Sequence, residues 1–194
     1  HPDKVYRDRT VDFFNQHIEA AVQLDCDHMV VSTGFAYLDV DAEDAFGWCA
    51  EAMGRIARKA EQEGVTLAVE PFTKYTTHIC NEASQLRRLL RTVNNPRLMG
   101  LADTDVIATT AVDTFSTFLD VIGPENLGHV HFVDGNPGGH LVPGDGVLDL
   151  DGALEKLKAI HYTGALGLEV LDRRYVFAPE AAMKQAMDWY KERI

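Results

Sequence analysis

Four residues of types that bind divalent metals stand at comparable places in the sequence, each at or near the end of a short apolar stretch. They are Glu70, Asp103, His131 and Glu169. If the apolar stretches are parallel strands, their carboxyl ends lie on one face of the fold, and in a barrel they converge on its axis. Three carboxylates crowded there repel one another, so one divalent metal ion is the natural compensation. Three oxygen ligands and one imidazole suit Mn²⁺, Mg²⁺ or Co²⁺, and Zn²⁺ also fits.

Each of these residues has an ordinary structural interpretation when taken alone. A carboxylate at a strand end often caps a helix or anchors a loop, and a histidine on a strand is more often packed in the core. The coincidence of all four favours a metal site. His129 falls on the same strand face as His131 by two-residue alternation, and we interpret it as a supporting residue rather than a ligand.

The segments around this site alternate between strand and helix patterns. Strands are expected at residues 28–31, 65–69, 98–102, 127–133 and 165–168. Between them, apolar residues recur at helical spacing, with Asp41 and Asn81 as expected N-caps and Pro179 in the first turn of a last helix. Strands separated by helices indicate parallel pairing, so a doubly wound sheet and a βα barrel both fit. No linker or repeat divides the chain, and we expect one domain over residues 1–194.

The composition of the chain argues against several classes of partner. The chain has 194 residues and a formal net charge of −12, which disfavours nucleic acid and anionic membranes as partners. No apolar run reaches the roughly 18 residues of a membrane span, and the first residues lack the apolar region of a signal peptide. Cys26, Cys49 and Cys80 form no CxxC motif, which predicts reduced, mostly buried thiols and a cytoplasmic protein.

Three segments, which contain Glu70, His131 and Glu169, resemble the xylose isomerase-like sugar-phosphate isomerase and epimerase superfamily. Residues 67–72 read LAVEPF and resemble its LEPL strand. Residues 128–134 read GHVHFVD and, with VPGDG at 142–146, resemble an HxHxxD…PGxG segment. Residues 162–170 resemble a GYxG…xxE ending. The likeness covers nearly the whole chain and is strongest toward the fructosamine and ketose 3-epimerases.

This resemblance implies a (β/α)₈ TIM barrel that is partial here. The five expected strands correspond to strands four to eight, and the first three βα units are absent. An open barrel leaves two sheet edges unpaired, so we expect further protein or a homo-oligomer to cover them.

The resemblance also implies an activity and roles for the four residues. The activity is metal-dependent proton transfer at the carbon next to the carbonyl of a small sugar, through a cis-enediolate, which epimerises carbon 3 of a ketose or fructosamine. Glu70 and Glu169 serve as both ligands and the acid/base pair. Asp103 and His131 serve mainly as ligands.

The substrate-contacting positions match this family less well than the metal positions. Ketose 3-epimerases carry a histidine where Val106 stands and a glutamate where Thr76 stands. Where they carry an arginine before the PG pair, this chain has His140, as in the fructoselysine type. His140, and with less support His78, are therefore the candidate substrate contacts.

The same four residues are compatible with other functions. An aldose–ketose isomerase needs the same metal and base, and an inosose-type dehydratase uses the same barrel. A hydrolase related to endonuclease IV needs more histidine ligands and a basic groove, which this acidic chain lacks. A non-catalytic truncated barrel acting as a binding module is the alternative of another class.

Overall fold

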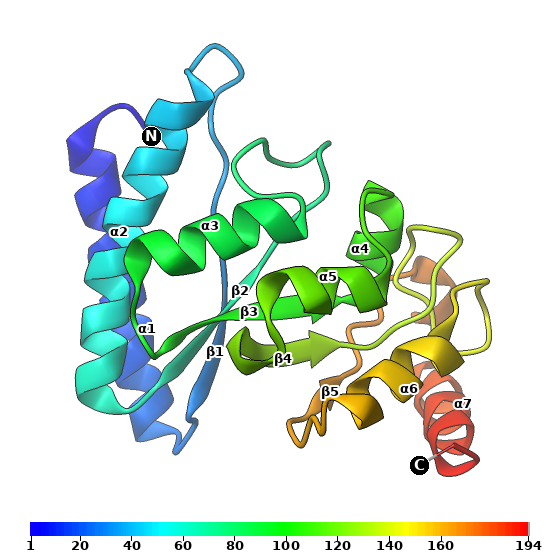
Figure 1. Ribbon diagram of the computed structural model, residues 1–194. Coiled ribbons are helices and arrows are strands. Elements are labelled where there is room, and N and C mark those ends of the chain that lie inside the picture. The colour runs from blue at the N-terminus through cyan, green and yellow to red at the C-terminus, as the bar shows by residue number, and fades with distance from the viewer. Residues whose placement is uncertain (194) are drawn as a thin grey trace.

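The computed structural model describes residues 1–193 and contains one five-stranded parallel sheet (Figure 1). The strands follow one another in space in the same order as in the sequence, β1 to β5. Their bounds are β1 His28–Ser32, β2 Thr66–Glu70, β3 Leu98–Asp103, β4 Leu127–His131 and β5 Leu166–Gly167. This order is that of a barrel wall, and it excludes the reversal of strand order that defines a doubly wound sheet.

Helices precede the sheet, connect its strands and follow its last strand. They are α1 Lys4–Gln23, α2 Ala42–Glu63, α3 Ala83–Val93, α4 Thr104–Thr110, α5 Phe115–Ile122, α6 Leu150–Ala159 and α7 Pro179–Lys191, with short 3₁₀ turns at Pro124–Asn126 and Arg173–Tyr175. Figure 1 shows α1 beside α2 at one end of the sheet and α7 at the other. The short helix α4, directly after Asp103, has no counterpart in the sequence prediction.

The helix-start predictions were right at two positions and wrong at one. The side chain of Asp41 accepts hydrogen bonds from the amides of Glu43 and Asp44, and Pro179 begins α7. Asn81 does not cap α3, whose N-cap residue is Glu82. Instead the Asn81 amide donates to the carbonyl oxygens of Phe72 and Thr77, at 2.9 and 2.6 Å, and so fixes the loop after β2.

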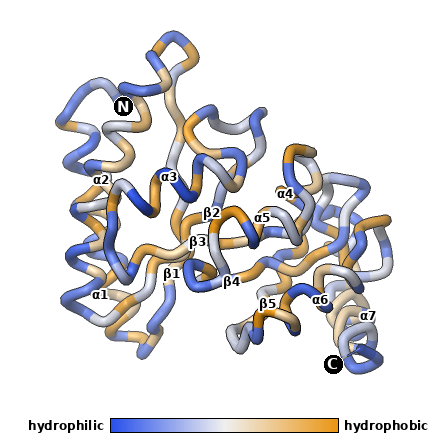
Figure 2. Tube along the Cα trace, in the orientation of Figure 1, coloured by the Kyte–Doolittle hydropathy of each residue, from blue (hydrophilic) through white to orange (hydrophobic). Residues whose placement is uncertain are grey.

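The hydrophobic core lies between the sheet and its helices. On β1, Val31 is 3% exposed, whereas Val30, which points to the opposite face, is 45% exposed. Every residue of β2 is buried. Figure 2 shows hydrophobic and hydrophilic positions alternating around α1 and α2, as expected for helices with one buried side. The three cysteines are free thiols, and Cys26 is exposed, contrary to expectation.

The sheet is an open section of barrel, as the sequence predicted. Within residues 1–193, β1 pairs only with β2, and β5 pairs only with β4. The prediction of a partial (β/α)₈ barrel is therefore confirmed. None of the helices in this part of the chain combines the length and apolar character that crossing a membrane requires.

Candidate metal centre

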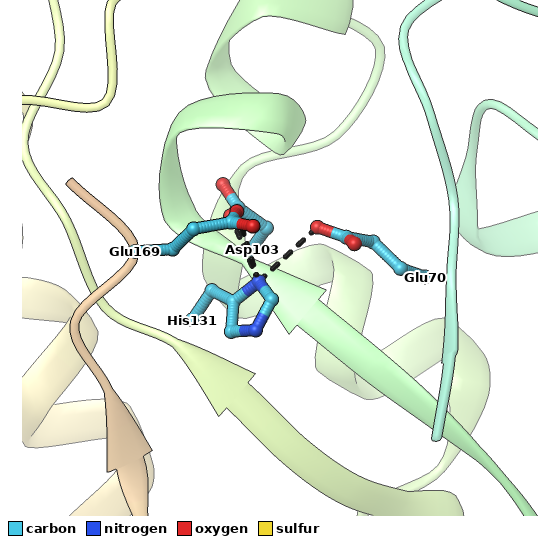
Figure 3. Close-up of side chains that lie close together, drawn as sticks. All are labelled: Glu70, Asp103, His131 and Glu169. Carbon is cyan, nitrogen blue, oxygen red and sulfur yellow. Dashed lines mark hydrogen bonds and ion pairs between the residues drawn. The ribbon is translucent and has the colours of Figure 1, made fainter. Parts of the chain in front are cut away.

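The parallel strands bring the four candidate ligands together at one mouth of the sheet. Glu70, Asp103 and His131 are the last residues of β2, β3 and β4, and Glu169 follows the end of β5. Asp103 is the register partner of His131 across β3 and β4. One ligand atom from each of the four lies within 4.8 Å of the others (Figure 3). Residues far apart in the sequence thus meet because their strands end at the same level.

His131 lies between the three carboxylates. Its Nδ1 is 3.2 Å from Oε1 of Glu70, 3.3 Å from Oε2 of Glu169 and 3.5 Å from Oδ2 of Asp103. Figure 3 shows Glu70 and Glu169 approaching from opposite sides. The Asp103 side chain is 1% exposed, whereas that of Glu169 is 37% exposed. The cluster is therefore closed at its base and open at the Glu169 side.

The two carboxylate oxygens of Asp103 have different surroundings. Oδ1 accepts hydrogen bonds from the amides of Asp105 and Val106, at 2.8 and 2.7 Å, and so caps α4. Oδ2 is buried and faces the cluster, where His140 Nε2 at 3.3 Å and His131 Nδ1 at 3.5 Å are ion-pair contacts, but it accepts no hydrogen bond of good geometry. A buried carboxylate oxygen without a partner is costly unless a cation balances it. The residues present therefore fit a divalent metal.

Without a metal, the carboxylates are balanced by protons on histidine. Burial alone would lower the pKa of His131, but its close contacts with Asp103 and Glu70 and the charge of Glu169 raise that pKa to about 10. Burial alone would raise the pKa of Asp103, but the nearby imidazoles of His131 and His140 lower it to about 2. Burial and the neighbouring Glu70 charge raise the pKa of Glu169.

His129 packs against the candidate ligand His131 and is not one of the four clustered groups. The two rings meet edge to face, with centroids 5.3 Å apart. Burial and the charge of His131 lower the pKa of His129. Both rings lie against Gly167 of β5, where a Cβ would come within 2.8 Å of His129 Nε2 and 3.2 Å of His131 Cδ2. Glycine at this position leaves room for the His131 ring.

Of the two candidate substrate contacts, the structure brings only His140 to the cluster. His140 Nε2 is 3.3 Å from both Asp103 Oδ2 and Glu169 Oε2. His78 lies in the loop between β2 and α3, and its Nε2 is buried without a hydrogen-bond partner. Within the described residues, no hydrogen bond or ion pair joins His78 to the cluster, so its role as a substrate contact stays a prediction.

Two buried aspartates organise the loop after β4: Asp134, which ends the HxHxxD segment but was given no role from the sequence, and Asp105, which the sequence did not single out. Asp134 accepts four backbone amides, those of Gly135 and Leu148 on Oδ1 and those of Gly144 and Gly146 on Oδ2. Asp105 accepts the amides of Gly138 and His140. The signal for Asp134 was its place directly before a glycine-rich loop. Asp105 had no comparable signal, because its partners are more than 30 residues away.

A parallel half-barrel with metal-type ligands at its carboxyl-terminal mouth defines a class of protein. The chain belongs to the xylose isomerase-like TIM barrel family, whose model matches residues 1–193.

A fructoselysine 3-epimerase from Shigella flexneri is 25% identical over 191 residues, which are 97% of this chain and 68% of that protein. The crystal structure of D-psicose 3-epimerase from Clostridium cellulolyticum H10 superposes with a TM-score of 0.87 at 18% identity, over all of this chain and 73% of that one. The zinc-binding IolI protein gives a TM-score of 0.80 at 19% identity, over 97% of this chain and 70% of that one. These two structural likenesses show the fold, and the family resemblance inferred from the motifs is confirmed.

Proposed function

We propose that this chain carries the metal site and the acid/base pair of a sugar 3-epimerase. The substrate would be a small ketose or a fructosamine, and the reaction would invert carbon 3 next to the carbonyl. The observation that carries the proposal is the meeting of Glu70, Asp103, His131 and Glu169 within 4.8 Å, with the two glutamates on opposite sides. The names of the fructoselysine and psicose 3-epimerases support the same reaction class.

The four clustered residues are also the ones that would hold the metal. A divalent cation bound there would polarise the sugar carbonyl and stabilise negative charge that develops on its oxygen. Three carboxylates and one imidazole favour Mn²⁺, Mg²⁺ or Co²⁺. Zinc is also compatible, since the IolI protein of the same fold binds it.

The two glutamates would move the proton. One carboxylate removes the proton from carbon 3 and leaves a cis-enediolate of the sugar. The other then delivers a proton to the opposite face of the same carbon, so the net change is inversion of that centre. Placement on opposite sides of one cluster is the geometry that this two-base mechanism needs. Asp103 and His131, which are more buried than Glu169, would hold the metal and take no part in proton transfer.

Solvent deuterium incorporation tests the proposal directly. The Mn²⁺-loaded protein is incubated in D₂O with fructoselysine or D-psicose, and NMR follows deuterium at each sugar carbon. We expect deuterium at carbon 3 together with the epimer. Glu70→Gln and Glu169→Gln should each lower the exchange rate at least about 100-fold, since general acid–base catalysis contributes that much. Glu155→Gln, on the exposed side of α6, is the matched control and should leave the rate unchanged.

The position of the label separates the alternatives. Deuterium at carbon 1 would indicate aldose–ketose isomerisation through the same cluster, and loss of water from an inosose would indicate a dehydratase. If the protein binds metal but exchanges no proton of any sugar with solvent, the proposed enzyme function is refuted and a non-catalytic binding module is the remaining alternative. The homo-oligomeric state and the cytoplasmic location stay predictions.

A further inference from the structure

We infer that Asp105 is a positioning residue for His140, which in turn contacts an oxygen of the substrate beside Glu169. This inference rests on the proposed function, adds Asp105 to the site and gives the candidate substrate contact His140 a partner. It concerns how the protein holds a histidine that lies in a glycine-rich loop. The evidence is the set of contacts that join α4, the loop after β4 and the segment after β5.

Asp105 is buried, and the polar contacts of its carboxylate go to this loop. The residue is 1% exposed. Its Oδ1 accepts the Gly138 amide at 2.5 Å, and its Oδ2 accepts the His140 amide at 3.1 Å. The same Oδ2 lies 2.9 Å from Nδ1 of the His140 ring. The chain passes close to this carboxylate at Gly135, where any Cβ would overlap Asp105 Oδ1.

The backbone of His140 is held in an uncommon conformation. Its φ of 48° lies in the left-handed region, which few residues other than glycine adopt. Both of its peptide groups are bonded, since the amide donates to Asp105 and the carbonyl accepts the Leu171 amide at 3.1 Å. Leu171 follows Glu169 closely on the segment after β5. His140 therefore hydrogen-bonds both to α4 and to the segment that carries Glu169, a proposed catalytic residue. Backbone strain of this kind is often found at functional positions.

The two ring nitrogens of His140 face different groups. Nδ1 faces Asp105, and Nε2 faces the cluster, 3.3 Å from Glu169 Oε2. The side chain is 16% exposed, so it is confined but still reachable from the mouth. Asp103 and Glu169 would help to hold the metal, and Nε2, which lies 3.3 Å from both carboxylates, would be placed to hydrogen-bond an oxygen of the sugar. A carboxylate on the far nitrogen fixes the orientation of an imidazole in this way.

The alternative is that Asp105 only anchors the loop. A double-mutant cycle on the Mn²⁺-loaded protein separates the two roles, with deuterium exchange and epimerisation of fructoselysine and D-psicose as the assay. Asp105→Asn keeps an oxygen for the Gly138 amide but presents an N–H to both the backbone amide and the ring of His140. We expect kcat/KM to fall about 10- to 100-fold, as for other residues that orient a site group, with Mn²⁺ affinity retained. His140→Gln should cause a loss at least as large.

The combined variant decides between the two roles. If Asp105 acts through His140, Asp105→Asn together with His140→Gln loses no more activity than His140→Gln alone. Losses that multiply would show an independent anchoring role and overturn the inference. An Asp105→Asn protein as active as the parent would overturn it as well.

A second measurement does not depend on activity. In ¹⁵N-labelled protein, NMR should show a long-lived Nδ1–H proton on His140, assigned by its loss in His140→Gln. Asp105→Asn should abolish that signal, and a His140 signal that survives the substitution refutes the positioning role. If the parent protein exchanges no sugar proton, the proposed enzyme function fails, while this NMR result still decides whether Asp105 positions His140.

Discussion

The two carboxylate oxygens of Asp103 have different neighbours. We predict that Oδ2 binds the metal and that Oδ1 stabilises the start of α4. Asp103→Asn keeps an oxygen that can accept the amides of Asp105 and Val106, so the cap of α4 survives. The amide nitrogen that replaces Oδ2 cannot bind a cation. Asp103→Ala removes both functions. The pair of variants therefore separates the ligand from the cap.

The expected magnitudes follow from mass action and from capping energetics. At a free Mn²⁺ concentration of about 100 Kd, binding stabilises the parent protein by about 2.7 kcal/mol. For a chain of this length that raises Tm by about 5–10 °C. Asp103→Asn should lose most of this increment. In EDTA both variants lack the charge of Asp103 and differ only in the cap of α4. Because such a cap contributes about 1 kcal/mol, Asp103→Ala should have a Tm about 2–4 °C below that of Asp103→Asn.

Thermal unfolding followed by circular dichroism, with 1 mM Mn²⁺ or with EDTA, measures both effects. An Asp103→Asn protein that gains as much Tm from Mn²⁺ as the parent would show that Oδ2 is not a ligand. Equal Tm values for the two variants in EDTA would show that Oδ1 does not stabilise α4. Either result refutes the corresponding half of the argument.

Two further predictions concern His131 without changing it. Gly167→Ala places a Cβ 2.8 Å from His129 Nε2 and 3.2 Å from His131 Cδ2, so we expect Mn²⁺ affinity to fall about tenfold in a calorimetric titration. Gly47→Ala, on the open face of α2 with no atom within 4 Å, should keep that affinity and add about 0.5–1 kcal/mol of stability. Because the pKa of His131 is raised to about 10 in the metal-free protein, Mn²⁺ must displace its proton. Affinity should then rise about tenfold per pH unit between pH 6 and 9, with one proton released, and a pH-independent affinity would contradict the proposed role of His131.

The positions of the four candidate ligands were predictable because they depend on local patterns. Each follows an apolar stretch that has strand character, and helices between the stretches make the strands parallel. Parallel strands end at one face, so the cluster follows from the order of elements alone. Asp41 is a similar case, since an N-cap is set by the residue and its immediate neighbours.

What could not be predicted depends on contacts between distant segments. The cap of α3 falls on Glu82 because Asn81 finds better partners in the carbonyls of Phe72 and Thr77, which the tertiary fold brings within reach. The helix α4 forms where Asp103 caps it, in the segment TDVIATT, whose threonine, valine, isoleucine and aspartate residues have weak helix propensity.

The same contrast explains why His140 was found and Asp105 was not. His140 stands in a motif whose spacing is visible in the sequence. Asp105 matters only because the loop after β4 folds back onto α4 and presents the Gly138 and His140 amides to it. Burial of the Asp105 carboxylate costs little free energy in the folded protein, because it accepts two amides and faces an imidazole. Nothing near Asp105 in the sequence predicts those partners. The positions of the four candidate ligands thus follow from local sequence patterns, whereas the position of Asp105 beside His140 follows only from the tertiary fold.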